Sequence, residues 1–233
     1  MVWDGDVSPQ GLAAVYTLPL GHGATLDGRA LYFLVDESAG GRDSDMIGGQ
    51  AVVRAPFGPW ALTLAGAYYH YRLGSLAGAD AGDFRDNLLS GGRYLSDYRL
   101  ADMIGTIAYS GLGKRWPIAV TADYVHNLGA AVPADSGYNV ELAVGRSTEP
   151  GDIRFAYNRS DVEVDAVLAA FSHDNIAIGT NYRLHGLVLD YVPVRHVLLN
   201  ASFYHYRPLD AFYAPIGAGD WRDRLRLSMM LSF

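Results

Sequence analysis

Apolar and polar residues alternate with a period of two along most of the chain. At the C-terminal end, five apolar residues share one parity: Leu225, Leu227, Met229, Leu231 and Phe233. Arg224 and Arg226 fall on the other parity. Because successive side chains of a strand point to opposite faces, this end is predicted to be a strand with one apolar and one polar face.

The same period predicts about eleven strands, at 11–19, 25–36, 46–55, 60–72, 98–110, 117–127, 137–146, 152–159, 181–192, 196–206 and the C-terminal stretch. A membrane-spanning helix needs about 20 consecutive apolar residues. The two longest charge-free runs, 7–26 and 55–71, are interrupted by proline and glycine. The pattern therefore indicates an all-β fold without transmembrane helices.

The connections between the predicted strands alternate in length. Short connections lie at 20–24, 56–59, 111–116, 149–151 and 193–195, and long ones at 37–45, 73–97, 128–136, 160–180 and 207–221. Short turns at one end and long loops at the other are typical of outer-membrane barrels. A soluble sandwich or lipocalin-like fold rarely keeps this rhythm. We therefore expect an antiparallel up-and-down transmembrane β-barrel, with residues 1–233 forming one domain.

The polar parity of these strands supplies a set of charged and amide side chains. Basic residues on a lipid-facing surface cost roughly 2–4 kcal/mol at mid-depth, so this parity is predicted to face a lumen. The predicted pore-lining residues are Asp27, Arg29, Gln50, Arg54, Asp123, Glu141, Arg154, Asp190, Arg224 and Arg226. They suit a water-filled channel of mixed charge. The alternative is an interior plugged by structural ion pairs.

Composition narrows the functional classes. The net charge of −7 argues against nucleic-acid binding, which rests on basic patches. Cysteine is absent, so neither a disulfide scaffold nor thiolate chemistry is expected. The 16 tyrosines suit strands and membrane–water interfaces.

The strand count has a further consequence. Bacterial barrels close with an even number of strands, whereas eleven are predicted here. If the last strand runs inward, the first also runs inward, and residues 1–10 start outside the cell. No signal peptide is recognisable at the N-terminal end, which lacks a basic start and an apolar core. We therefore expect an N-terminally truncated chain from which an odd number of strands is missing.

Several stretches are more distinctive than the alternation alone: Trp-Asp-Gly-Asp at 3–6 with the continuation to 13, Gly137-Tyr138 leading to Val144-Gly145-Arg146, Pro150-Gly151-Asp152, Val-Asp-Ala-Val within 162–171, His185, and the closing 223–227. Together they resemble the bacterial putative porin family of outer-membrane proteins. The resemblance spans essentially the whole chain, and the opening third of the family is what the chain lacks. It implies passive diffusion of small hydrophilic solutes or ions through the bacterial outer membrane.

The same interpretation implies candidate partners: outer-membrane lipids, the barrel-assembly machinery, small hydrophilic solutes and further copies of the chain in a homo-oligomer. The C-terminal apolar ladder ending on Phe233 looks like the signal that the assembly machinery reads. The alternative is an ordinary last strand. The stretch 162–171 is predicted either to fold inward and narrow the pore or to extend a strand above the membrane.

Other chemistry is less favoured by the sequence. Acidic pairs at Asp4/Asp6, Asp43/Asp45 and Asp80/Asp83 lack the spacing of a calcium-binding EF-hand. His126 and His185 are candidates for a barrel lipase, but no catalytic motif surrounds them. No enzyme activity, cofactor or metal is expected. The competing functions are a structural or adhesive barrel with a closed lumen and, less favoured, a barrel enzyme.

Overall fold

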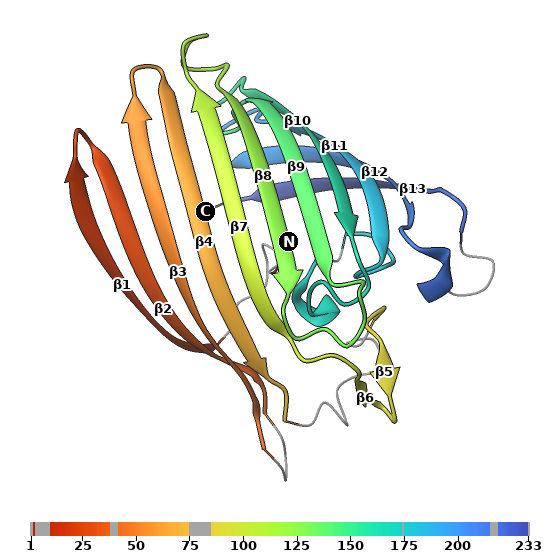
Figure 1. Ribbon diagram of the computed structural model, residues 1–233. Coiled ribbons are helices and arrows are strands. Elements are labelled where there is room, and N and C mark those ends of the chain that lie inside the picture. The colour runs from red at the N-terminus through yellow and green to blue at the C-terminus, as the bar shows by residue number, and fades with distance from the viewer. Residues whose placement is uncertain are drawn as a thin grey trace.

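The chain folds into one large antiparallel sheet in a computed structural model that describes residues 2, 10–37, 42–74, 85–173, 175–214 and 219–232 (Figure 1). Its strands are β1 (Gln10–Gly21), β2 (Ala24–Asp36), β3 (Ser44–Phe57), β4 (Trp60–Arg72), β7 (Arg99–Tyr109), β8 (Ile118–Asn127), β9 (Ser136–Gly145), β10 (Ile153–Val162), β11 (Tyr182–Tyr191), β12 (Val197–Pro208) and β13 (Arg222–Leu231). Each strand pairs with its neighbours in chain order. The predicted all-β, up-and-down arrangement of about eleven strands is therefore confirmed.

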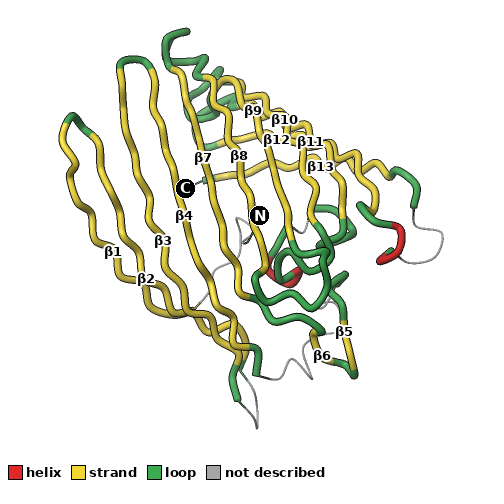
Figure 2. The backbone as a smooth tube through the Cα atoms, in the orientation of Figure 1, coloured by secondary structure: helices red, strands yellow, loops and turns green. Residues whose placement is uncertain are grey.

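Smaller elements of the described residues lie in the long connections (Figure 2). A short hairpin, β5 (Leu89–Ser90) and β6 (Arg93–Tyr94), follows β4. Two 3-10 turns, Ala169–Phe171 and Ala211–Tyr213, precede β11 and β13. Within the described residues no helix is both long and apolar enough to cross a membrane.

The sheet is curved but open. β1 is hydrogen-bonded to β2 alone and β13 to β12 alone, so the described strands leave two free edges. The connections gather by length at the two ends of the sheet, as the sequence predicts. The five short turns lie at one end and the five long loops at the other (Figure 1).

One face of the sheet is concave, and we call it the inner face. Met46 of β3, Leu100 of β7 and Tyr204 of β12 all belong to a single buried apolar cluster. Strands so far apart in the sheet contact one cluster only if the sheet curves around it. The cluster lies toward the long-loop end, where Val162 and Tyr182, the facing ends of β10 and β11, also join it.

The opposite, convex face, which we call the outer face, is apolar and exposed. Leucine, isoleucine, valine, phenylalanine and tyrosine occupy alternate positions along its strands. Residues on this face that are more than a third exposed include Leu12, Tyr32, Leu64, Met103, Ile107, Val120, Leu142, Phe155, Leu189, Phe203 and Leu227. Soluble proteins rarely expose an apolar surface of this extent, so this face is built to be covered.

Candidate channel lining

The register of the sheet places all ten predicted lining residues on the inner face. Four of them meet on β2 and β3. Asp27 is an ion-pair partner of Arg54 and Arg29, and it accepts a hydrogen bond from Thr17 Oγ1 at 2.8 Å. Arg29 Nη1 donates to Gln50 Oε1 at 3.1 Å. The sequence places these side chains on one face, and the structure shows that they form one network.

A second network spans β9 to β12. The guanidinium of Arg154 lies between two carboxylates, donating to Glu141 Oε1 at 3.0 Å and to Asp190 Oδ2 at 3.2 Å. Asp190 also accepts from Asn200 Nδ2 at 2.6 Å. Since the guanidinium of Arg154 donates to two acids, its side chain has one preferred position on the inner face. Two carboxylates and one guanidinium leave this part of the inner face acidic.

The middle of the inner face carries a pair of acids. Asp123 of β8 is a diagonal neighbour of Asp102 of β7, because Asp123 pairs in register with Ile104. Both are less than one tenth exposed. The prediction included Asp123 and missed Asp102, although Asp102 has the same polar parity on its strand. Further along these strands, the hydroxyls of Thr106 and Thr121 lie 2.9 Å apart.

The last two predicted lining residues lie at the edge of the sheet. Arg224 and Arg226 on β13 pair in register with Tyr204 and Ser202, so they share the inner face. Both are exposed. Arg226 donates to the side chain of Asn175 from the long connection before β11. The structure therefore does not bring these two arginines into either ionic network.

The stretch 162–171 folds onto the inner face. Val164, Ala166, Val167 and Leu168 are each 0–1 % exposed, and the last three belong to the inner-face cluster. The segment does not extend β10, which ends at Val162. Of the two predicted alternatives, the inward fold is the one that the structure shows.

A buried carboxylate joins this segment to the connection between β4 and β7. Asp165, 0 % exposed, accepts from the backbone N–H of Leu88 at 3.0 Å and from Ser96 Oγ at 2.6 Å. The hydroxyl of Tyr98 and the amide of Asn87 each lie 3.4 Å from its Oδ1. Burial raises the pKa of the Tyr98 hydroxyl well above its usual range, so this group stays a donor.

The amide of Asn87 completes the junction. Its Nδ2 donates to the carbonyl oxygens of Val164 and Val167 at 2.8 and 3.0 Å, and its Oδ1 accepts from the N–H of Ala169 at 2.7 Å. Asn127 at the end of β8 donates to the Asp165 carbonyl at 2.8 Å. We call 85–98 and 163–172, joined in this way, the loop core. Strand periodicity gives no signal for it.

The short-turn end has a buried carboxylate of its own. Asp152 accepts from the N–H of Glu149 at 2.9 Å and lies 2.8 Å from Arg146 Nε. Arg115, from the turn between β7 and β8, lies 3.6 Å from its other oxygen. Burial opposes ionisation, but the N–H groups and Arg146 outweigh it and lower the pKa of Asp152. Gly151 has a φ of 83°, which a side chain would strain, so glycine suits this tight turn.

The two candidate histidines have structural partners. His126 Nδ1 lies 3.3 Å from Asp135 Oδ1 on the outer face. Its register partner Ser136 donates its hydroxyl to Glu163 Oε2 at 2.9 Å. His185 lies between Tyr157 and Arg159. The described residues contain no group of three potential metal ligands.

The apolar ladder of the C-terminal strand lies on the outer face. Leu225, Leu227, Met229 and Leu231 are all more than half exposed. Phe233 lies outside the described residues, as do Asp4, Asp6, Asp80 and Asp83 of the acidic pairs.

No family model, curated protein or solved structure matches this chain.

Proposed function

We propose that this chain forms the wall of an outer-membrane channel through which small hydrophilic solutes or ions diffuse passively. The observation that carries the proposal is the reversed polarity of the sheet. Its outer face exposes large apolar side chains, whereas its inner face carries the ionic networks of Asp27 and Arg154. A polar interior and an apolar exterior are the requirement for a barrel in lipid.

Aromatic side chains at both ends of the outer face support the same function. Near the short turns lie Phe57, Trp60, Tyr109, Trp116 and Tyr191. Trp60 and Tyr109 contact each other with ring centroids 4.5 Å apart. Nearer the long loops lie Tyr32, Tyr68, Tyr124, Tyr138 and Trp221. Two aromatic belts separated by an apolar band are typical of transmembrane barrels.

The proposal requires partner strands for the two free edges. In hydrocarbon, an unpaired backbone N–H or C=O group costs several kcal/mol. The open edges of β1 and β13 are therefore incompatible with lipid until each pairs with a further strand. The resemblance to the putative porin family supports the same closed barrel and its location in the bacterial outer membrane.

The loop core favours a second candidate, a structural or adhesive barrel with a closed lumen. Asp165 and the apolar residues around it cover part of the inner face at the long-loop end. If the loop core narrows the lumen, the protein is a channel with a constriction. If it fills the lumen, the polar inner face is a set of structural ion pairs and solutes do not pass.

Planar-bilayer recording separates the two candidates. The purified protein is inserted into a bilayer in 1 M KCl, and stepwise current increases are expected for a channel. Insertion is verified independently by protease protection in vesicles. Protein that inserts with both sheet edges paired and still carries no current contradicts the channel and supports the closed barrel.

A further inference from the structure

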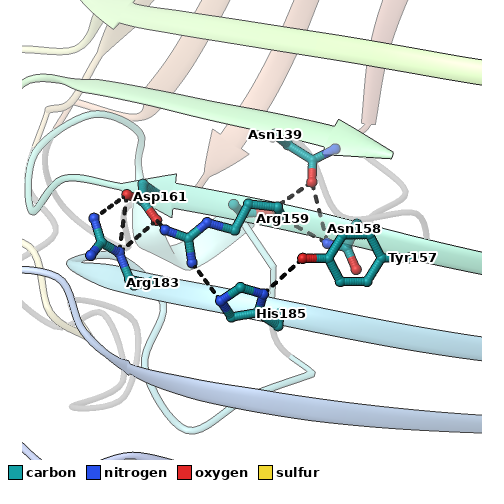
Figure 3. A network of polar contacts seen from close by, with 8 residues as sticks. Asn139, Tyr157, Asn158, Arg159, Asp161, Arg183 and His185 are labelled. Atoms are coloured by element: carbon teal, nitrogen blue, oxygen red, sulfur yellow. Dashed lines mark hydrogen bonds and ion pairs between the residues drawn. The ribbon is translucent and has the colours of Figure 1, made fainter. Parts of the chain in front are cut away.

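Three arginines interrupt the apolar outer face on neighbouring strands. They are Arg159 on β10, Arg183 on β11 and Arg207 on β12, near the long-loop end (Figure 3 shows the first two). Arg183 pairs in register with Arg207, and Arg159 pairs with His185. The residue beside Arg159 on β9 is Val140, and the next along, on β8, is Ala122. At the level of Arg159, the charge therefore does not continue onto β9 and β8.

Two of these arginines are held in place by a carboxylate. Asp161, whose side chain is 9 % exposed, lies 2.9 Å from Arg159 Nη2 and 2.6 Å from Arg183 Nη2. Arg159 Nη1 also lies 2.8 Å from His185 Nε2. Because a guanidinium only donates, this imidazole nitrogen accepts and the other carries the proton toward the hydroxyl of Tyr157 at 2.8 Å (Figure 3).

The third arginine is supported by stacked rings. Arg207 lies over the ring of Trp221, with its guanidinium carbon 5.0 Å from the ring centroid. Trp221 stacks on His205 at 4.2 Å between centroids, nearly parallel, and His205 Nδ1 lies 2.6 Å from Asp223. The Nε of Arg207 is buried and has no hydrogen-bond partner in the described part of the chain. We call the three arginines with these supports the outer-face cluster.

The arrangement leaves a positive charge that needs a partner. Arg183 and Arg207 lie directly opposite each other on the adjacent strands β11 and β12. Like charges in such a cross-strand pair are destabilising. The single carboxylate of Asp161 is already shared by Arg159 and Arg183. Charge on a lipid-facing surface is expensive unless it is paired. An anion between Arg183 and Arg207 would remove both penalties.

We propose that the outer-face cluster binds the phosphate headgroup of an anionic lipid. This inference rests on the proposed function, since it requires the outer face to contact lipid. On the same face, beyond the row of His185 and His205, lies an apolar row of Leu187, Phe203 and Leu225, which pair in register. These side chains are 37–64 % exposed. A headgroup on the arginines would place its acyl chains along this row, which free phosphate cannot use.

Native mass spectrometry of the detergent-purified chain tests this site. The probes are dioleoyl phosphatidic acid, dioleoyl phosphatidylcholine as the zwitterionic reference, and inorganic phosphate as competitor. The wild-type chain is expected to retain phosphatidic acid in preference to phosphatidylcholine. Removing two charge-assisted contacts with R183Q/R207Q should weaken that retention about tenfold or more. Inorganic phosphate at equal concentration should not displace the lipid.

The matched control is R224Q/R226Q, which removes two arginines from the inner face of the next strand. It should retain phosphatidic acid as the wild type does. Should R183Q/R207Q not fold, Arg207→Gln alone serves, because the contact of Arg207 with Trp221 is not an ion pair.

Three outcomes would overturn the proposal. The first is equal retention of phosphatidic acid and phosphatidylcholine by the wild-type chain. The second is a loss of phosphatidic acid in R224Q/R226Q as large as in R183Q/R207Q. The third is a dimer that dissociates in R183Q/R207Q without any effect of lipid, which would assign the surface to a second copy of the chain. Conductance of the same samples reports separately on the channel. A conducting protein without lipid preference contradicts only the lipid site.

Discussion

The two ends of the sheet each bury a carboxylate, and they stabilise it in different ways. Asp165 in the loop core is 0 % exposed and is held by a backbone N–H, two hydroxyls and an amide. Asp152 at the short turns is 1 % exposed and lies beside two guanidiniums, those of Arg146 and Arg115. The first therefore has neutral donors, and the second has ion pairs.

The two ends should respond differently to the loss of their buried carboxylate. The donors around Asp165 are themselves buried, with Asn87, Ser96 and Tyr98 all 5 % exposed or less. If the carboxylate is lost, water cannot easily replace it. The side chains of Arg146 and Arg115 are 25 % and 57 % exposed, so water can replace Asp152 for them. The stability of the long-loop end should therefore depend on its buried hydrogen bonds. The stability of the short-turn end should depend on the charges of its ion pairs.

The largest effect is expected from Asp165→Ala. Leaving several buried donors without an acceptor should destabilise the loop core locally by about 3 kcal/mol or more. Amide hydrogen exchange in 85–98 and 163–172 should then accelerate. Under the proposed function, single-channel conductance should rise because the loop core withdraws from the inner face.

Asp152→Ala is the control for that comparison, since it removes a buried carboxylate from the opposite end. It should leave hydrogen exchange in the loop core unchanged. Equal protection of the loop core in Asp165→Ala and the wild type would contradict a carboxylate-held loop core. Faster exchange without any rise in conductance would place the constriction elsewhere.

Substitutions on the inner face between the two ends should change ion selectivity more than stability. Arg154→Glu places a third carboxylate beside Glu141 and Asp190. The ratio of cation to anion permeability, read from reversal potentials in a salt gradient, should rise about twofold or more, because a lumen lined by one sign of charge concentrates the opposite ion. Arg154→Gln should give an intermediate ratio.

Arg226→Glu should shift the permeability ratio in the same direction but less, since Arg226 lies exposed on the edge strand. Unchanged reversal potentials for both glutamate variants would mean that the ions follow a path that these residues do not line.

Acid should weaken the short-turn end. The pKa of Asp152 is lowered by the fold, so its carboxylate favours the folded state above the unfolded pKa of about 3.9. That contribution is complete near neutral pH and is lost as the pH falls through the folded pKa. Midpoints of denaturant unfolding from pH 7 to pH 3 should therefore fall less steeply below pH 5 in Asp152→Asn than in the wild type.

Glu149→Gln, in the same turn, controls for the loss of one negative charge because Glu149 is largely exposed. It should keep the steep acid dependence of the wild type. Identical acid dependence in Asp152→Asn and the wild type would remove Asp152 as its source.

Much of the fold could be predicted because strand formation leaves a local signal. Each of the eleven strands alternates within its own sequence, so periodicity locates it and assigns Arg54 or Arg154 to the polar face. It does not reveal partners. That Arg154 lies between Glu141 and Asp190 depends on the register of three strands, and Asp102 was missed although its parity is the same.

The loop core was beyond sequence reasoning for a different reason. The strands β5 and β6 have two residues each, too few to show a period. Asp165 contacts residues 67–77 positions away, and no local pattern encodes such a distance. An acid within the apolar stretch 162–171 is the one visible sign, because an apolar run that folds inward must supply a partner for it.

The smallest effect is expected from substitutions of the two arginines at the short-turn end, which should differ in their effect on stability. Arg115 lies 3.6 Å from Asp152 and its side chain is 57 % exposed, whereas Arg146 lies 2.8 Å away and is 25 % exposed. Exposed ion pairs contribute little, because water and salt screen them. Arg115→Gln should therefore leave the unfolding midpoint unchanged within error, and Arg146→Gln should lower it measurably at low salt. An effect of Arg115→Gln as large as that of Arg146→Gln would mean that Asp152 needs both cations, and the two ends would then differ less than their contacts indicate.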